Sequence, residues 1–210
     1  MRILALVLLV CLVATPAVAQ RTMTVLASPT TFDGQSGHAF RIDTPGDGVE
    51  EFFFTENANG LVEFYGYRQP PALFEVLGGQ YLVPITTADV PSVTTFAFIE
   101  DCGAAQATYQ GMVEITVPAG TFMTYQYDIG DSCNPGYVER MYWADGVGLV
   151  RNAYYDDMGG FVDGWNLSSY TINGGSGLFP RAIGNQWEFT EGSVSNDDAS
   201  FGTLKSRFTD

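Results

Sequence analysis

The residue types that perform nucleophilic catalysis are scarce in this chain. His38 is the only histidine among 210 residues, so a Ser-His-Asp or Cys-His mechanism would have to use it, and a zinc site with several histidines is excluded. The Gly-Ser segments at 34–37 and 174–177 miss the spacing of a Gly-x-Ser-x-Gly nucleophile elbow. Lys205 has no glycine-rich loop before it, and 146–148 lacks the third glycine of a dinucleotide fingerprint. We therefore expect no catalytic residue and no cofactor, with His38 an incidental, exposed residue on a strand.

Oxygen ligands for a metal ion are present but poorly spaced. The segment 43–48 begins like a calcium-binding EF-hand loop, yet its third position is proline and Phe54 stands where the bidentate glutamate is required. Other acids lie in turn-like segments: Asp128 with Asp131, and Asp156 with Asp157 and Asp163. Solvated turns are the simpler interpretation, so we predict no metal site and a hairpin loop at 43–48.

Carbohydrate chemistry has limited support from residue types. The sequence has 24 acidic residues, but no spacing selects two of them as a glycosidase pair. A glycan-binding surface would use aromatic stacking platforms, for which the candidates are Tyr65, Tyr67, Trp143 and Trp165. Packing of these rings into a core is the simpler interpretation.

Residues 1–19 have the features of a secretory signal peptide. Arg2 supplies a positive start, 3–13 is an apolar run, and 17–19 is an A-x-A cleavage site. The apolar run is too short for a membrane-spanning helix. We therefore predict cleavage before Gln20, no integral membrane segment after cleavage, and a periplasmic or extracellular location.

The net charge limits the possible partners. It is −15 at pH 7 and becomes one unit more negative when Arg2 leaves with the signal. Such a charge disfavours nucleic acids and anionic lipid surfaces, while dispersed carboxylates keep an exported β protein soluble. The expected partner is an apolar ligand, a glycan or a protein.

Two cysteines remain once Cys11 is removed with the signal. Cys102 and Cys133 both lie in turn-like segments, and an even number of cysteines in an exported protein favours a disulfide. We predict a Cys102–Cys133 bridge, with two free thiols as the alternative. The chain has no Cys-x-x-Cys pair, which argues against a redox role.

The pattern of apolar residues predicts an all-β fold. Short runs rich in Val, Thr, Tyr and Phe alternate with Gly, Asn, Asp and Pro, and no helical periodicity stands out. The predicted strands are 22–27, 38–42, 49–55, 61–67, 72–76, 80–83, 93–99, 106–117, 121–129, 137–143, 148–155 and 161–172. Short connections favour an antiparallel meander that forms a curved sheet, a half-barrel or a sandwich.

We expect one all-β domain at 20–172. A Gly-rich break opens the next segment, 173–190, which ends in a further strand. The last residues, 191–210, are polar and acidic enough to form a loose tail.

Three motifs carry a resemblance to a protein family. They are Val-Pro-Ala-Gly-Thr-Phe with Pro118, Gly120 and Phe122, Asp-Gly-Val-Gly-Leu-Val with Gly146 and Gly148, and Phe-Pro-x-x-x-Gly-Asn-x-Trp with Gly184 and Trp187. The chain resembles uncharacterised secreted bacterial proteins with such hairpins. The resemblance implies that these residues shape a sheet, and that the fold is similar to the half-barrel of periplasmic lipoprotein and lipid carriers.

In such proteins the third motif usually opens a domain, whereas here it stands near the end of the chain. We expect its strand to fold back and complete the single sheet, with a truncated second copy as the alternative. The sequence thus predicts an exported, non-enzymatic binding or envelope and extracellular structural module. The alternatives are a carrier of a lipid or other apolar ligand in a half-barrel cavity and a carbohydrate-active protein.

Overall fold

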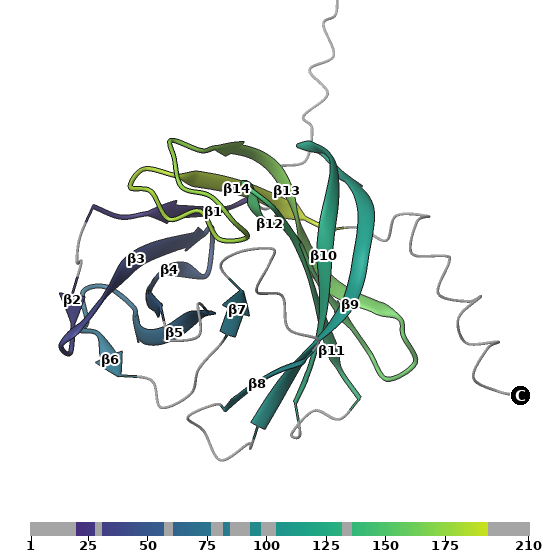
Figure 1. Ribbon diagram of the computed structural model, residues 1–210, viewed down its shortest axis with the longest axis horizontal. Helices are drawn as coiled ribbons and strands as arrows, with labels where there is room; N and C mark the ends of the chain where they lie inside the picture. The colour runs from purple at the N-terminus through teal and green to yellow at the C-terminus, as the bar shows by residue number, and fades with distance from the viewer. Residues whose placement is uncertain are drawn as a thin grey trace, which may run out of the picture.

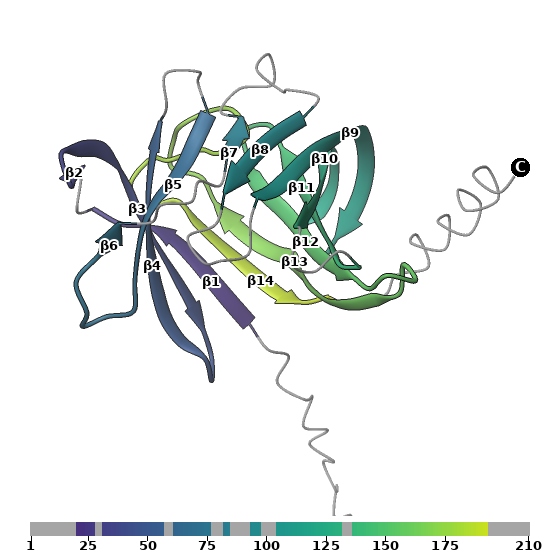
Figure 2. The same cartoon turned by 90° about the horizontal axis from the view of Figure 1, so that it is seen from below.

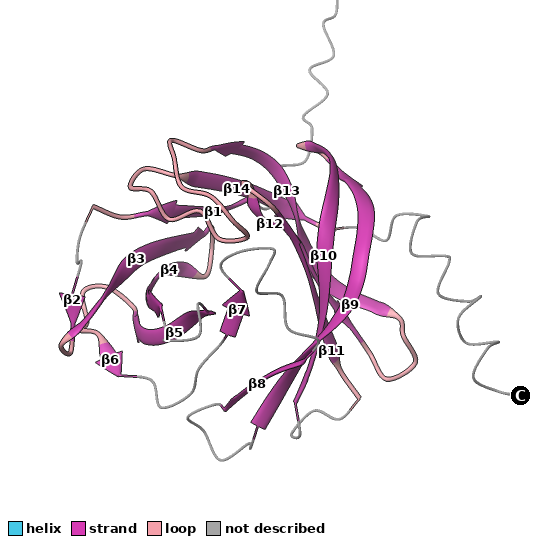
Figure 3. Cartoon of the chain, viewed as in Figure 1, coloured by secondary structure: helices cyan, strands magenta, loops and turns pink. Residues whose placement is uncertain are grey.

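The protein is built from β-strands throughout the part of the chain that can be described. The computed structural model describes residues 20–27, 31–56, 61–76, 82–84, 93–97, 104–131 and 136–192. Within these ranges the regular elements are all strands, as Figure 3 shows, and the strands join into one antiparallel sheet that does not close. This confirms the predicted all-β class and curved sheet. No helix long and apolar enough to cross a membrane occurs in these ranges.

The sheet has two arms that differ in sequence position. The first arm is formed by the first half of the chain. It contains β1 (Gln20–Val25), β2 (Thr31–Phe32), β3 (Gln35–Thr44), β4 (Gly48–Glu56), β5 (Leu61–Arg68), β6 (Glu75–Val76) and β7 (Leu82–Pro84). The second arm contains β8 (Val93–Ala97), β9 (Ala104–Val117), β10 (Gly120–Asp131), β11 (Val138–Ala144), β12 (Gly148–Tyr155), β13 (Phe161–Thr171) and β14 (Gln186–Glu191).

Both arms are meanders, and they meet where β1 pairs with β14. The strand order is β6-β5-β4-β3-β1-β14-β13-β12-β11-β10-β9-β8, with β2 added to β3 and β7 to β5. The middle pair runs from Gln20 opposite Thr190 to Thr24 opposite Gln186. Figure 2 shows β1 and β14 side by side between the arms. The strand of the third motif is therefore an interior strand of this sheet.

Curvature brings the far ends of the sheet toward each other. β7 from the first arm and β8 from the second have Cα atoms within 8 Å, although the described residues form no ladder between them. In Figure 1 these two short strands face each other below the centre of the molecule. The sheet therefore has an inner face, turned toward the space between the arms, and an outer face.

The main core lies on the inner face. Because side chains alternate along a strand, the register assigns one set of residues from each strand to this face. Phe40 on β3, Trp187 and Phe189 on β14, Leu167 on β13 and Trp143 on β11 are all buried in one apolar cluster. The predicted strand 106–117 is observed as β9, and at 113–117 its odd-numbered residues are more buried than Glu114 and Thr116, so this part of the strand is half-buried.

A second, smaller apolar cluster lies on the outer face of the first arm. Phe53 on β4 is fully buried there, and its ring lies 5.6 Å from that of Phe32 and 6.4 Å from that of Phe74. Gly66 allows this packing, because a Cβ atom at that position would lie 2.8 Å from the Phe32 ring. The cluster explains why β2, too short to be predicted from the sequence, pairs with β3.

The observed strands agree with the predicted ones apart from their ends and two short elements. The prediction for 72–76 was too long, because only Glu75–Val76 is a strand and the residues before it form a turn that follows Pro70 and Pro71. The segment 43–48 forms a hairpin in which the Asp47 amide donates to the Thr44 carbonyl at 3.0 Å, as expected.

The connection between β13 and β14 packs into the core. Leu178 is fully buried, and Phe179 is 4% exposed. The Phe179 ring lies 4.9 Å from Phe40 and 5.3 Å from Phe54 in the first arm, and 5.5 Å from Trp143 in the second. Phe179 therefore links the inner faces of the two arms.

Replacement of Phe179 by alanine tests this link. We expect Phe179→Ala to lower the free energy of unfolding by about 3–5 kcal/mol, because the change leaves a cavity among three buried rings. Ile183→Ala, in the same segment but 58% exposed, serves as the control and should change stability by less than about 0.5 kcal/mol. If urea denaturation gave the same loss of unfolding free energy for Phe179→Ala and Ile183→Ala, Phe179 would not hold the arms together.

Candidate functional site

The motif residues of the second and third motifs meet at one structural junction. The Trp187 indole is fully buried, and its Nε1–H donates to the Val147 carbonyl at 2.6 Å. Its ring covers Gly148, where a Cβ atom would lie 3.2 Å from Nε1. Gly148 also has a φ of +104°, a conformation that glycine adopts without strain. The hairpin between β11 and β12 is thereby fixed to β14.

Asn185 organises the connection that precedes β14. It is fully buried, its Oδ1 accepts from the Asn173 amide at 2.7 Å, and its Nδ2 donates to the Gly174 carbonyl at 2.9 Å. The Gly184 amide donates to the Val25 carbonyl at 3.1 Å, and Gly184 has a φ of +82°. These bonds explain why Gly-Asn precedes the Trp187 strand in the third motif.

The first motif forms the turn between β9 and β10 and contacts β13. Gly120 has a φ of +138° and pairs with Val117 in the hairpin that contains Pro118. The Ala119 amide donates to the Leu167 carbonyl at 3.0 Å, where the β13–β14 ladder shifts register. The Phe122 ring packs edge-on against Tyr170. All three motifs therefore lie at structural contacts between hairpins.

A double-mutant cycle tests the junction at Gly148. Gly148→Ala should destabilise the protein by about 1–2 kcal/mol from φ strain alone, and by more because the new methyl group meets the indole. Gly46→Ala is a matched control, since Gly46 has a φ of +95° and open space around it. We expect Gly148→Ala to lower the free energy of unfolding more than Gly46→Ala does. This difference between the two substitutions should become smaller when Trp187→Phe is also present. Equal costs in both backgrounds would contradict the contact.

The inner face of the second arm carries a row of aromatic and polar side chains that runs across five strands. Each residue of this row lies opposite the next one on the neighbouring strand. The row consists of Tyr109 on β9, Tyr127 on β10, Met141 on β11, Asn152 on β12 and Trp165 on β13. We call these five residues the inner row. Because neighbouring strands lie about 4.8 Å apart, the Cα atoms of Tyr127 and Asn152 are about 10 Å apart.

Tyr127 has a buried hydroxyl without a partner among the described residues. Its side chain is 4% exposed, and its ring lies 5.5 Å from that of Tyr109. Burial, with the neighbouring hydroxyls of Tyr109 and Tyr125, raises the pKa of Tyr127 well above its usual value. The group therefore remains an uncharged O–H that can donate and accept a hydrogen bond.

Asn152 carries the second such atom on the inner row. Its Nδ2 donates to Glu139 Oε1 at 3.0 Å and lies 3.3 Å from the Tyr154 hydroxyl, which itself donates to Glu139. Because a carboxylate only accepts, these bonds fix the orientation of the amide. Asn152 Oδ1 is then left buried and without a hydrogen-bond donor in the described part of the chain.

Arg21 packs against Trp165, the last residue of the inner row. The guanidinium carbon lies 4.3 Å from the centre of a Trp165 ring, and Nε donates to Thr44 Oγ1 at 3.1 Å. Trp165 and Arg21 are both half-buried, as are Tyr109 and Met141. The two buried polar atoms are therefore flanked by side chains that solvent partly reaches.

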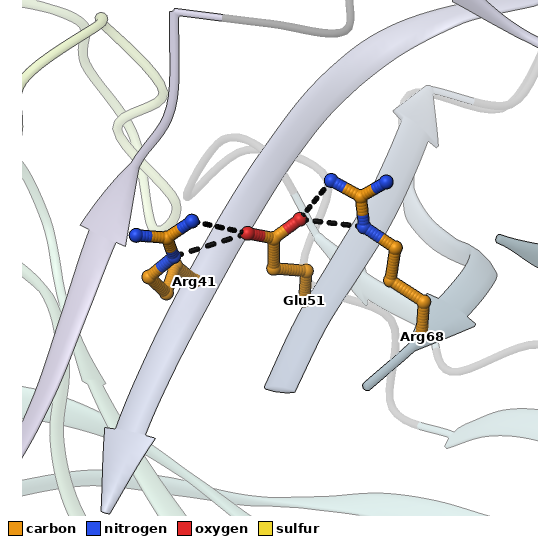
Figure 4. A network of polar contacts seen from close by, with 3 residues as sticks. All are labelled: Arg41, Glu51 and Arg68. Carbon is orange, nitrogen blue, oxygen red and sulfur yellow. Dashed lines mark hydrogen bonds and ion pairs between the residues drawn. The ribbon is translucent and has the colours of Figure 1, made fainter. Parts of the chain in front are cut away.

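Two ion-pair networks lie on the outer face. Glu51 on β4 is fully buried and accepts from Arg41 Nε and Nη2, at 3.0 and 2.6 Å, and from Arg68 Nε at 2.7 Å. Figure 4 shows Glu51 between the two guanidinium groups, which come from the flanking strands. Asp128 and Arg140 form a second pair at 2.6 Å on the second arm.

The Glu51 pair gives a pH-dependent contribution to stability. Burial alone would raise the pKa of Glu51, but the hydrogen bonds from Arg41 and Arg68 outweigh burial and lower it. Stability from this carboxylate is therefore complete above the pKa of the unfolded chain and is lost as the pH falls through the lower folded-state pKa. Glu51→Gln should cost about 1–3 kcal/mol near neutral pH.

The measurement is urea denaturation at neutral and acidic pH, with the exposed Glu114→Gln as control. The difference in free energy of unfolding between Glu51→Gln and the wild type should become smaller on acidification. The free energy of unfolding of Glu114→Gln should equal that of the wild type at every pH. A gap that stays constant across the pH range would show that Glu51 does not titrate with folding.

The other residues singled out by the sequence do not assemble into a catalytic site. His38 lies on β3 and is half-buried, where we expected exposure; burial and then Arg181 lower its pKa. Tyr65 donates to Asp33, Tyr67 donates to Glu50, and Trp143 is in the core. These aromatic residues thus do not form one stacking surface with Trp165.

Two of the acidic candidates for calcium, Asp128 and Asp156, are bound to other protein groups. Asp156 Oδ1 accepts from the Met158 and Gly160 amides, and Asp128 binds Arg140. No cluster of three or more potential metal ligands occurs in the described residues. Cys102, Cys133, the signal segment 1–19 and the tail after 192 lie outside those residues, so the disulfide and export stay predictions.

Sequence reasoning missed Tyr127 and Asn152. The alternation of Tyr125 and Tyr127 on a predicted strand was a signal that both rings share a face. Nothing in the sequence placed Asn152 on that same face, because its cross-strand partners were not known.

Comparisons with known proteins do not extend this description. No protein family model matches the chain, and no significant match was found among curated proteins or solved structures. The resemblance to secreted bacterial proteins therefore remains a prediction from the motifs.

Proposed function

We propose that the protein is a non-enzymatic binding module that holds a small, largely apolar molecule against the inner face of its second arm. The observation that carries this proposal is the inner row, in which the Tyr127 ring lies 5.5 Å from the Tyr109 ring and the Tyr127 hydroxyl is buried without a partner among the described residues. Such a group costs about 1–3 kcal/mol in the free protein, and a ligand that pairs with it recovers this energy.

The shape of the sheet supports a binding role. The sheet does not close, and β9, which carries Tyr109, is one strand from the end of the sheet at β8. Tyr109, Tyr125 and Met141 are half-buried, so rotation of their side chains would admit a ligand to Tyr127. The proposed ligand corresponds to the carrier of a lipid or other apolar ligand that the sequence left as an alternative.

A neutral fluorescent probe tests the proposal. N-phenyl-1-naphthylamine should bind the wild-type protein at one saturable site with increased fluorescence. Tyr109→Asn should weaken binding about tenfold, because it removes part of the aromatic surface that the probe would bury. Gln110→Asn changes the exposed neighbour on the same strand and should bind as the wild type does.

Cooperative thermal unfolding of each variant checks that the fold is retained, since loosely packed states also bind such probes. Absence of saturable binding in the folded wild type, or equal weakening by both substitutions, would contradict the proposal.

A further inference from the structure

The inner row has a polar end whose hydrogen-bonding pattern is specific. Asn152 Oδ1 can only accept a hydrogen bond, and both amide hydrogens are directed to Glu139 and Tyr154. A ligand group that satisfies Asn152 must therefore be a donor. The Tyr127 hydroxyl, on the same row about 10 Å away between Cα atoms, can donate or accept.

We propose that the ligand carries an uncharged hydroxyl group, which donates to Asn152 Oδ1 and accepts from the Tyr127 hydroxyl. This inference rests on the proposed binding function and names the chemical class of the ligand, a long-chain or polycyclic alcohol. A hydroxyl group supplies both a donor and an acceptor, and the register puts its two partners on either side of Met141 on the sheet.

The surrounding charges disfavour an ionised head group. A carboxylate or a phosphodiester has no proton to offer Asn152 Oδ1, and it would lie beside Glu139, which is already bound to Asn152 and Tyr154. Arg21, a neighbour of the inner row, would attract an acid, but its Nε is bound to Thr44 and its guanidinium stacks on Trp165. An ether would satisfy Tyr127 and leave Asn152 without a donor.

Three probes with the same apolar chain separate these possibilities. 1-Decanol, decyl methyl ether and decanoate are each titrated against the complex with N-phenyl-1-naphthylamine at mildly alkaline pH, where decanoate is ionised. We expect 1-decanol to displace the probe at an at least fivefold lower concentration than either of the others, about the effect of one buried acceptor that is left unpaired.

Variants locate the selectivity on Asn152. Asn152→Leu should remove the difference between 1-decanol and the ether. Tyr127→Phe should weaken the binding of both and leave their difference in place, because both accept a hydrogen bond from the Tyr127 hydroxyl. Asn166→Leu is the matched control, because Asn166 also has a buried Oδ1 without a partner in the described residues but lies opposite Arg151, on the outer face. The control should retain the full preference for 1-decanol.

The outcomes distinguish this inference from the function on which it rests. Equal displacement by all three probes, or a preference for decanoate, would overturn the alcohol assignment and leave apolar binding intact. No displacement by any of them would overturn both. A preference that survives in Asn152→Leu would place the selecting group elsewhere and also overturn the inference.

Discussion

The pairing of β1 with β14 is the constraint on which the rest of the structure depends. Within the described residues, it is the only ladder that joins the two arms, because β1 also pairs with β3 and β14 with β13. The backbone bonds of Val25 to Gly184 and Asn185 extend the pair, and Trp187 connects it to the hairpin at Gly148. The two arms curve toward each other around this seam, which gives the sheet an inner face.

Two buried polar atoms without a partner among the described residues lie on one row of the inner face, whereas on the outer face Asn166 Oδ1 is a single such atom, and the inner-face arrangement supports the functional account. On the outer face Glu51 is bound by two arginines and Asp128 by Arg140, so buried charge is compensated by hydrogen bonds. On the inner row Tyr127 and Asn152 each keep a buried atom without a partner among the described residues. Unpaired buried groups are uncommon in folded proteins, and a ligand gives these two a physical explanation.

Much of the fold could be predicted from the sequence, because each strand has its own local signal. Alternation at 113–117 and the turn residues at Gly46 and Gly146 act over a few positions, so they indicated strands and hairpins without knowledge of the tertiary structure. β2 was missed because it depends on the Phe32–Phe53 contact, which joins residues that no local pattern relates. The inner row was missed for the same reason. It arises from register across five strands, and the sequence does not specify that register.

The central claim is that the inner face holds a small molecule, and a native mass spectrum tests it most directly. The protein would be purified without detergent from cells that produce it and measured before and after denaturation, beside Tyr109→Asn. The account predicts one added small mass on the folded wild-type protein that is released on denaturation and reduced in the variant. A folded protein with the mass of the bare chain, unchanged by the substitution and by added 1-decanol, would contradict it.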